Sequence, residues 1–393
     1  MRWMLECKER AKKAINKPPL IGPDIPISKY LGGGALGQEA VKEAPELAYA
    51  SGIDLRMKGR AATYVQIDQK VVMEQVAKMY KGKIELMSIK EALERYNWLE
   101  DYWWRAVPVD QDKFTALVEL KLHNGYFIRI LPGQKVDMPI QACLLIYHDR
   151  VAQNVHNIII AEPGSEAHII TGCMIRPIST GLHVGVTEFY LKRGSKVSYT
   201  MIHSWSRGAH VRPRSAAILD EGAVLINNYV NLRSVGSIQA YPTFYCRGNG
   251  SRVSSNSILF GDNDSLIDVG NKIVLEGVDS RGEIISRSIA KDKARMYARG
   301  LIVGKSERAK GHFECRGLLL SDNATIHAVP ELIGTKRGSE LSHEAAIGKI
   351  SREQIEYLMA RGLSMRDATS LIVKGFLDCL LYTSDAADEL DGV

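Results

Sequence analysis

Short apolar runs separated by turn residues fill the middle of the chain. From about Thr115, runs rich in Val, Ile, Leu and Tyr recur about every seven to ten residues, with Gly, Asn, Asp and Ser between them. This is the pattern of strands joined by turns. Examples are ALVELKL, GYFIRI, ACLLIY, NIIIAE, AHIITG, VTEFYL, VSYTMI and AVLINNYVNL. No clear helical pattern interrupts this stretch before about residue 345, so we predict a mainly β core over residues 111–345.

A local repeat favours a coil of strands over a sandwich. RGEIIS begins at Arg281, RGLIVG at Arg299 and RGLLLS at Arg316, so the three copies are almost evenly spaced. A short, regular period is what the stacked turns of a β-solenoid would give, because each turn places its apolar positions on those of the previous turn. We therefore predict that one turn has the length of the interval from Arg281 to Arg299. Three copies leave an array of hairpins open as the alternative.

Residues 1–110 are predicted to form helices and loops. Lys70–Met79 (KVVMEQVAKM) places three valines and a methionine near helical spacing, and Ile89–Trp104 continues a mixed polar and apolar helical pattern. Segments rich in Pro and Gly connect these elements. We expect this region to flank the β core.

Residues 346–378 return to a helical pattern. Ser351 precedes Gln354 by three residues, and Ser364 precedes Asp367 by three, so each serine can open a helix with a capping box. Arg361-Gly362 supplies a stop between the two helices. Such helices could cap the open edge of a solenoid or present a docking surface. Their apolar faces contain Ile355, Leu358, Met359, Ala368, Leu371, Ile372 and Phe376.

The last residues are interpreted differently. CLLYTSDAADE at Cys379–Glu389 looks like the read-through of a transposase-type sequencing adaptor. We therefore expect residues 379–393 to be an artefact and the natural chain to be cut off near Asp378. The alternative is a natural acidic tail.

Composition limits the classes of function. The chain has 393 residues and a net charge of +6 with no basic block, so we expect no nucleic-acid binding. No apolar window approaches the length of a membrane span, and the N-terminus MRWMLECKERAKKA places Glu and Lys where a secretory signal is apolar. The expectation is a cytoplasmic protein that binds no membrane. Its six cysteines form no CxxC pair, so they should be free thiols.

Cysteine, histidine and glutamate gather late in the β region. Cys315, His327, His343 and Glu344 lie on the last predicted strands and on the turn into the helices. Thiolate, imidazole and carboxylate groups together can hold iron, zinc or a nascent cluster, and thiolate is the soft ligand of iron–sulfur chemistry. Each residue alone has a structural alternative as a buried cysteine or a hydrogen-bonded histidine.

Cys173 is the second candidate for chemistry. It follows the predicted strand AHIITG, and it is either a packed core residue or a nucleophilic sulfur acceptor, which requires the thiolate form and some exposure. Cys143 and Cys246 lie inside apolar runs and are expected to be core residues. Cys7 lies on a polar helix and is assigned no role.

The end of the chain resembles a known family. LSHEAAIGKI at Leu341–Ile350, continued by EQIEYLMARGLSMRDATSLIVKGF, looks like the C-terminal signature of the SufB/SufD proteins, which assemble iron–sulfur clusters. EAHIITGC at 166–173 resembles a strand of the family that ends in Gly-Cys, and His327-Ala-Val-Pro330 resembles its His-Thr-Val-Pro segment. The interval from Cys315 to Glu344 also fits the family pattern. The resemblance covers roughly residues 110–378.

The resemblance implies a right-handed parallel β-helix with helical ends, in complex with the ABC-type ATPase SufC. It implies that Cys173 accepts persulfide sulfur from a donor protein and that this sulfur passes through the β-helix. It implies that Cys315, His343 and Glu344 hold iron and a transient iron–sulfur cluster at a subunit interface, with His327 as a supporting group. The ATPase-docking residues would be Ile355, Tyr357, Leu358, Met359, Leu371, Ile372 and Phe376.

One feature departs from the family pattern. The family divides the cluster-site groups between SufB and SufD, whereas this chain carries cysteine, histidine and glutamate together. The chain could therefore form a homodimer or a heterodimer with a SufB/SufD paralogue. Cys173, Cys315 and Glu344 resemble SufB, and the compact N-terminal region resembles SufD-like relatives. The chain has no nucleotide-binding motif of its own, so ATP hydrolysis is expected in the partner.

Three other functions stay open on the residues alone. A β-helix hydrolase or lyase acting on polysaccharide would need paired acidic residues and aromatics along one groove, plus a signal peptide, and neither is evident. A Cys–His enzyme using Cys315 and His343 would need an oxyanion site and an orienting acid. An adaptor that only docks an ATPase would need no cysteine. We expect a scaffold rather than an enzyme.

Overall fold

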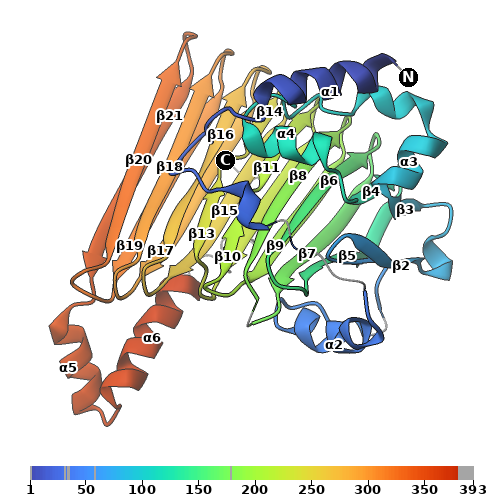
Figure 1. Ribbon diagram of the computed structural model, residues 1–393. Helices are drawn as coiled ribbons and strands as arrows, with labels where there is room; N and C mark the ends of the chain where they lie inside the picture. The colour runs from blue at the N-terminus through green and yellow to red at the C-terminus, as the bar shows by residue number, and fades with distance from the viewer. Residues whose placement is uncertain (1, 31, 33–35, 57–58, 178, 379–393) are drawn as a thin grey trace.

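The chain folds into a two-sheeted β-solenoid with helices at both ends (Figure 1). The structure is a computed structural model that describes residues 2–30, 32, 36–56, 59–177 and 179–378. Within these residues one sheet, called sheet B, has ten strands and the other, sheet A, has eleven. The solenoid makes about eight turns of parallel strands. The predicted mainly β solenoid is confirmed.

The elements of the described residues are as follows. Sheet B contains, in spatial order, β2 (Lys70–Val76), β1 (Ala62–Ile67), β5 (Lys135–Ile146), β7 (Glu166–Ile175), β9 (Lys196–Ser204), β12 (Val224–Asn231), β15 (Arg252–Gly261), β17 (Arg281–Ala290), β19 (Lys310–Leu319) and β21 (Glu340–Lys349). Sheet A contains β3 (Ile84–Ser88), β4 (Tyr126–Ile130), β6 (Val151–Ala161), β8 (Gly181–Leu191), β10 (Ala209–Val211), β11 (Arg214–Leu219), β13 (Ser237–Ala240), β14 (Thr243–Cys246), β16 (Leu266–Leu275), β18 (Arg295–Gly304) and β20 (Thr325–Gly334). The α-helices are α1 (Arg2–Ala14), α2 (Gln38–Tyr49), α3 (Ile89–Arg95), α4 (Lys113–Leu120), α5 (Arg352–Ala360) and α6 (Met365–Asp378), and short 3-10 helices cover Ile27–Tyr30, Lys78–Tyr80 and Asn97–Asp101.

Each turn of the solenoid contributes one strand to each sheet, so it is longer than the predicted repeat. Arg252 pairs in register with Arg281, and Arg281 pairs in register with Lys310. The interval between these partners is the length of one turn. The three RG copies lie on β17, β18 and β19, which alternate between the two sheets. The copies on successive strands therefore do not stack on one another, and the predicted period from Arg281 to Arg299 is wrong.

The number of residues in one turn of the solenoid is shown by the residues with positive φ that lie between the strands. Such residues recur at a nearly constant interval, at Gly133, Gly164, Gly194, Gly222, Gly250, Asp279, Arg308 and Gly338. Backbone hydrogen bonds stack these turns, because the N–H of Gly164 donates to the carbonyl of Arg193 and the N–H of Gly194 to that of Glu221. Positive φ favours glycine, so the spacing of these glycines reports the length of one turn.

Several elements differ from the predictions, because residues 1–110 contain strands β1 and β3 as well as helices and loops. Lys70–Val76 is strand β2 and not a helix, because it pairs antiparallel with β1 across a turn at Asp68. The run ALVELKL does not form a strand, because its first five residues belong to helix α4. Asp112 begins α4 by accepting hydrogen bonds from two backbone N–H groups of its first turn. The division of the chain at residues 110 and 345 stays a prediction.

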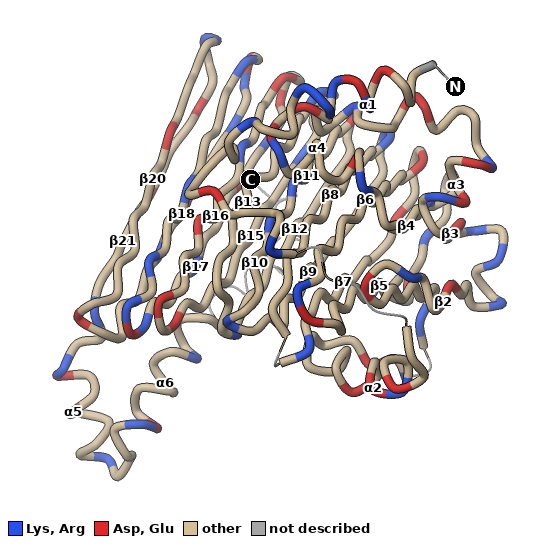
Figure 2. The backbone as a smooth tube through the Cα atoms, in the orientation of Figure 1, with Lys and Arg blue, Asp and Glu red and all other residues tan. Residues whose placement is uncertain are grey.

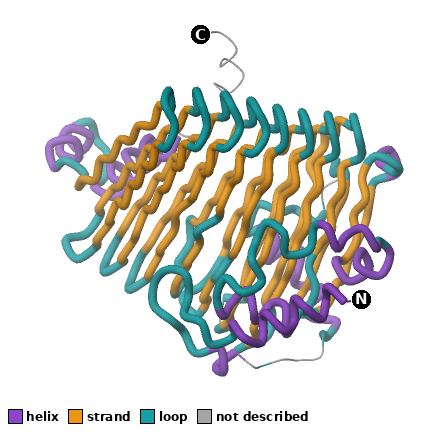
Figure 3. Tube along the Cα trace, turned by 90° about the horizontal axis from the view of Figure 1, so that it is seen from above, coloured by secondary structure: helices purple, strands orange, loops and turns teal. Residues whose placement is uncertain are grey.

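Within the described part of the chain, three apolar cores hold the elements together. The largest lies inside the solenoid, where alternate residues of the strands of both sheets meet. A second lies on the outer face of sheet A under α1, α3 and α4, and a third lies on the outer face of sheet B under α2. Figure 3 shows these helices against the stacked strands. Along the helix-covered turns, both faces of a strand are therefore buried.

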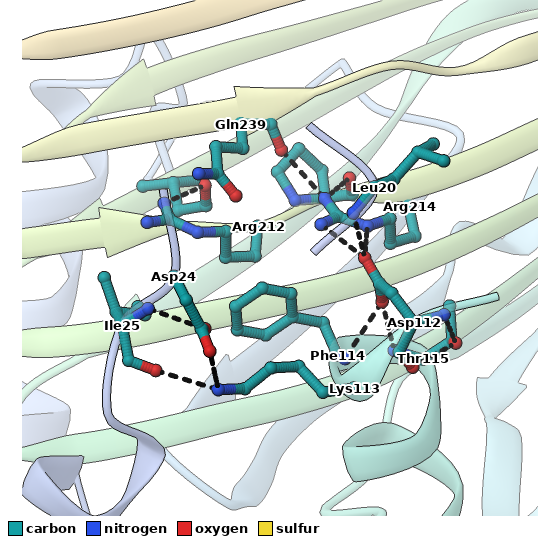
Figure 4. A network of polar contacts seen from close by, with 12 residues as sticks. Leu20, Asp24, Ile25, Asp112, Lys113, Phe114, Thr115, Arg212, Arg214 and Gln239 are labelled. Atoms are coloured by element: carbon teal, nitrogen blue, oxygen red, sulfur yellow. Dashed lines mark hydrogen bonds and ion pairs between the residues drawn. The ribbon is translucent and has the colours of Figure 1, made fainter. Parts of the chain in front are cut away.

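Buried charges fix the N-terminal segment to sheet A. Asp112 Oδ2 lies 2.7 Å from Arg214 Nη2 on β11, and both side chains are almost fully buried (Figure 4). The ring of Phe114 lies under the guanidinium groups of Arg212 and Arg214. Removing one member of a buried pair leaves an uncompensated charge, so this network holds α4 on the solenoid.

Helices α5 and α6 extend away from the end of the solenoid (Figure 1). Both helices are confirmed, and the Asp367 N–H donates to Ser364 Oγ at 3.1 Å as the second capping box requires. Ser351 forms no such bond at the start of α5, so the first capping box is wrong. The tail from residue 379 to residue 393 lies outside the described residues. In the part of the chain that the structure describes, no helix is long and apolar enough to cross a membrane.

Candidate functional site

The C-terminal end of the solenoid is open. Strands β20 and β21 each pair with a neighbour on one side only among the described residues. Ile333 on β20 is 46% exposed and Ile347 on β21 is 40% exposed. Strand edges with free backbone groups and exposed apolar side chains are surfaces that proteins usually cover or pair.

Cys315 lies one strand in from this open end. On β19 the buried positions alternate, so that Phe313 and Cys315 face the interior while Glu314 and Arg316 face outward. Burial raises the pKa of Cys315 to about 11, with Arg287 lowering it and Glu314 raising it by smaller effects. Burial therefore disfavours the thiolate form of Cys315 in the single chain.

His343 and Glu344 lie on β21 next to Cys315 but face opposite sides. His343 pairs in register with Phe313, and Glu344 pairs with Glu314. Paired residues of parallel strands lie on the same face, and successive residues alternate. His343 therefore shares the inner face with Cys315, while Glu344 lies on the outer face. The structure brings two of the three predicted ligands to one face.

Glu344 belongs to a ladder of charges on the outer face of sheet B. Arg287 Nη2 lies 2.8 Å from Glu314 Oε1, and Arg316 Nε lies 2.6 Å from the same oxygen. Arg316 Nη2 also lies 3.6 Å from Glu344 Oε1. The carboxylate of Glu344 is thus already engaged by a cation of the neighbouring strand.

His327 lies on the other sheet. It is on β20 of sheet A, and its exposed ring stacks on that of Tyr297 with centroids 4.9 Å apart. The structure does not bring it together with Cys315. Among the described residues, no three His, Cys, Asp or Glu side chains gather as a metal site. One chain by itself does not complete the predicted cluster site.

Cys173 is fully buried on β7 with its side chain in the interior of the solenoid. Burial, with a smaller effect of Cys143, raises the pKa of Cys173 well above its usual value. Gly172 before it faces outward, where a Cβ atom would lie 2.4 Å from Ser51 Oγ and 2.7 Å from Ile53 Cδ1. Glycine at this position lets the segment after α2 close over the strand.

A column of inward side chains connects the region of Cys173 to Cys315. Its successive ladder partners are Thr171, Met201, Tyr229, Ser257, Ser286 and Cys315. An internal cavity lies against this column, and its polar lining includes Tyr199, Asn227, Tyr229, Ser255, Ser257 and Asn271. The volume of the cavity is about 30 Å³. Since one water needs about 10–15 Å³, the cavity has room for about two waters.

The two C-terminal helices form a groove that faces solvent. Glu353, Gln354, Tyr357, Leu358 and Ile372 line it. Tyr357 is 59% exposed and Leu371 is 51% exposed, although both are large apolar side chains. Ala368 is buried between the helices. Of the predicted docking residues, three line this groove, two are exposed beside it and two are half-buried, which are respectively Tyr357, Leu358 and Ile372, Met359 and Leu371, and Ile355 and Phe376.

Comparison with known proteins assigns the family. A family model described as the SUF system FeS cluster assembly SufBD core domain matches residues 145–376, from the end of β5 into α6. This chain belongs to the SufBD family. The matched region contains Cys173, Cys315, His343 and Glu344, together with most of the solenoid and the C-terminal helices.

Relatives of the SufBD family match nearly the whole chain. An iron-sulfur cluster assembly SufBD family protein of Methanothermobacter thermautotrophicus is 45% identical over 381 residues, which are 94% of this chain and 92% of the relative. One from Archaeoglobus fulgidus is 46% identical over 83% of this chain and 87% of the relative. One from Staphylococcus epidermidis is 28% identical over 96% of this chain and 85% of the relative. The chain is thus an iron–sulfur cluster assembly protein of this family.

Of the other cysteines in the described part of this SufBD chain, Cys143 and Cys246 are packing residues. Cys246 lies in the interior core, and Cys143 lies under α2 with its sulfur 3.9 Å from that of Met174. Both were predicted to be core residues, and this is confirmed. Cys7 is half-buried against the core beneath α1.

Reasoning from the sequence missed His203. It is the ladder partner of Cys173 on β9 and lies on the same inner face, where it is almost fully buried. Neither of its ring nitrogens has a hydrogen-bond partner. The alternation in KVSYTMIHS could have placed it there, because every second residue from Val197 onward is apolar or aromatic and buried.

Proposed function

We propose that this SufBD protein is a cytoplasmic scaffold that combines sulfur and iron into a transient iron–sulfur cluster, in complex with a SufC-type ATPase. Cys173 would accept sulfur as persulfide from a donor protein. The cluster would form at the open end of the solenoid, where Cys315 and His343 lie. Sulfur and iron are the cargo of this scaffold, which would not act as an enzyme on an organic substrate or on polysaccharide.

The observation that carries the proposal is that Cys173 and Cys315 face one interior. Five ladder steps of about 4.8 Å separate their strands, or roughly 24 Å. Hydroxyl and amide groups line part of the space between them, and the cavity there has room for small polar guests. These features support passage of sulfur from Cys173 to Cys315 through the solenoid.

The open end supports a cluster site shared between two chains. A second copy, or a SufB/SufD paralogue, could pair with the free edges of β20 and β21 and cover the exposed isoleucines. Glu344 lies on the opposite face from Cys315 and His343, which favours ligation by groups from more than one chain. Mixed Cys, His and Glu ligation should hold a cluster less firmly than four thiolates, as transfer to a carrier requires.

The C-terminal helices support the docking of an ATPase. Tyr357, Met359 and Leu371 are large exposed side chains on a hairpin that extends beyond the solenoid. ATP-driven movement of a partner bound there would be transmitted to β21, because α5 follows this strand directly. Nucleic acid and membrane have no part in the proposal. In the view of Figure 2, acidic and basic residues are interspersed and form no basic face.

The test is anaerobic co-expression with the cognate SufC-type ATPase, followed by an absorption spectrum of the purified complex. Cys315→Ala should lose most of the cluster absorbance, because the thiol is the soft ligand of the site. Cys246→Ala is the matched control, since Cys246 is another buried cysteine of the same interior core. It should keep the absorbance. Full absorbance in Cys315→Ala would contradict the proposal.

A further inference from the structure

The interior around Cys173 contains polar groups that have no partners. His203 lacks a partner at both ring nitrogens, Trp205 at its indole N–H, and Tyr229 at its hydroxyl. Their rings contact one another, with centroids 5.2 Å apart for His203 and Trp205 and 4.7 Å apart for His203 and Tyr229. Buried polar groups are nearly always hydrogen-bonded, because an unpaired one loses its bonds to water without replacing them. A concentration of such groups therefore indicates a site for a small guest.

The position of this site relates it to sulfur chemistry. His203 is the ladder partner of Cys173, so the two side chains lie next to each other on the inner face. Tyr229 also lines the internal cavity, which lies against the column of inward side chains between β7 and β19. The guest site therefore lies where the path through the solenoid begins.

We propose that His203 accepts the proton of the Cys173 thiol while Cys173 takes up sulfur, and that the chamber formed by His203, Trp205 and Tyr229 then holds the terminal S–H of the resulting persulfide. This inference rests on the proposed role of Cys173 as the sulfur acceptor.

The step balances in atoms and electrons. The Cys173 sulfur attacks the terminal sulfur of a donor persulfide R–S–SH, its proton passes to His203, and a new S–S bond forms. The S–S bond of the donor breaks, and its electron pair leaves with R–S⁻, which takes the proton back from His203. The products are Cys173–S–SH and R–SH. Sulfur is transferred with no net oxidation, so no further reactant is needed.

Burial keeps His203 neutral, so that its ring can accept a proton, but burial also makes the imidazole a weaker base. Burial, with a smaller effect of His183, lowers the pKa of His203 well below its usual value. The titratable groups that face it are Cys173 from β7, Tyr229 from β12 and His183 from β8. Burial also keeps the Cys173 thiol protonated. A neutral base beside a neutral thiol is the arrangement that general-base assistance requires, and such assistance contributes about 10²–10⁴ in rate.

The test measures the rate at which Cys173 becomes a persulfide. The full-length protein is incubated anaerobically with inorganic polysulfide, and Cys173–S–SH is quantified by alkylation and peptide mass spectrometry between pH 6 and pH 9. His203→Gln keeps a hydrogen-bonding side chain but removes the base. His210→Gln is the control, because His210 is a partly buried histidine that contacts Tyr30 outside the chamber and hydrogen-bonds to Ser237 at 2.7 Å.

At pH 7 we expect His203→Gln to load at least about 100-fold more slowly than the wild type, and His210→Gln to load like the wild type. The ratio of wild-type to His203→Gln rates should fall about tenfold per pH unit, because only the variant depends on prior ionisation of the thiol. This ratio cancels the ionisation of the probe itself. Thermal unfolding verifies folding, and His203→Asn provides a second variant for the same measurement.

A ratio that stays constant with pH, or an equal loss of rate in His210→Gln, would overturn the inference, because either result reports packing and not proton transfer. A wild-type protein whose Cys173 takes up no persulfide would count instead against the proposed function itself. The two failures are therefore distinguishable.

Discussion

Arg316 Nη2 lies 3.6 Å from Glu344 Oε1 on the outer face of sheet B, and its Nε lies 2.6 Å from Glu314. Arg316 follows Cys315 in sequence, so one strand presents the thiol to the interior and the arginine to the outside. In the single chain the carboxylate of Glu344 is therefore paired with the guanidinium of Arg316. Before it could bind iron, it would have to exchange this arginine for the metal.

Removing Arg316 should strengthen iron binding slightly. Exposed ion pairs are worth about 0–1 kcal/mol, so we expect Arg316→Gln to lower the dissociation constant for ferrous iron by about fivefold at most in an anaerobic titration. Lys310→Gln is the control, because Lys310 forms an exposed pair with Glu340 across the same two strands. Weaker iron binding in Arg316→Gln than in Lys310→Gln would contradict the idea that Arg316 competes with iron.

Ionisation of Cys315 should destabilise the protein at alkaline pH. Burial raises the pKa of Cys315 from 9.0 in the unfolded chain to about 11 in the folded chain. Between these values the unfolded chain has lost the proton and the folded chain still holds it, so stability is present below pH 9 and is lost as the pH rises to 11. The loss should be about 2–3 kcal/mol.

Urea unfolding at pH 8, 9, 10 and 11 provides the measurement. Other buried groups also titrate in this range, so the comparison is between the wild type and Cys315→Ala. The variant should lose about 2–3 kcal/mol less than the wild type across the range. Parallel curves for the two proteins would show that Cys315 does not titrate with a raised pKa.

Gly172 should tolerate no side chain. Its Cβ would lie 2.4 Å from Ser51 Oγ and 2.7 Å from Ile53 Cδ1, so Gly172→Ala should push the segment after α2 away from β7 and cost about 1–3 kcal/mol in thermal or urea unfolding. Gly348→Ala on β21 is the control, because no atom lies within 4 Å of its Cβ position. A cost below about 0.5 kcal/mol for Gly172→Ala would show that the segment after α2 moves freely.

The strands and the two C-terminal helices were predictable from the sequence, whereas the length of one turn and the conformation of β2 were not. The alternation of buried and exposed positions was sufficient to predict strands, and the C-terminal residues were sufficient to predict two helices, because both patterns are local. The turn length was misread because the RG copies are conspicuous, whereas the turn glycines such as Gly164 and Gly194 carry the period. Strand β2 was misread because its pairing with β1 decides its conformation, and pairing is not visible in one short run.

The candidate site was predictable as a set of residues but not as a geometry. The resemblance identified Cys173, Cys315, His343 and Glu344. It gave no register, and the register decides which of the neighbouring residues His343 and Glu344 lies on the same face as Cys315. His203 was not found, because its proposed role depends on the pairing of β7 with β9, which places it next to Cys173 in the following turn of the solenoid.

A buried pair should anchor the N-terminal segment. His156 Nε2 lies 2.8 Å from Glu188 Oε2 with both side chains fully buried, and Glu188 also accepts hydrogen bonds from the backbone N–H groups of Trp104, Ala106 and Val107. Glu188→Gln would replace this charged acceptor by an amide and should cost about 3–5 kcal/mol in urea unfolding.

The control for this prediction is an exposed carboxylate. Glu221 lies 3.6 Å from Arg193 with both side chains exposed, so Glu221→Gln should cost less than about 1 kcal/mol. Equal costs for Glu188→Gln and Glu221→Gln would mean that the buried carboxylate is not the anchor of the segment over sheet A.

The two exposed surfaces at the C-terminal end should act independently. Ile347 on β21 lies over Gly317 at the open end of the solenoid, and Leu371 lies on α6. If the open end pairs with a second chain, Ile347→Asp would place a charge in that interface and should shift the protein toward the monomer by at least tenfold in dissociation constant. Leu371→Asp should leave this equilibrium unchanged and should weaken ATPase binding by a similar factor, since charged residues are depleted from interface cores.

Light scattering measures the first equilibrium, and isothermal titration with the ATPase measures the second. Met73→Asp is the control for both, because Met73 is an exposed apolar residue on the edge strand β2 at the other end of sheet B. It should affect neither equilibrium. Loss of ATPase binding in Ile347→Asp together with an unchanged oligomeric state would assign the open end to the ATPase and not to a second chain. Loss of dimer in Leu371→Asp would place the chain–chain contact on the helical hairpin.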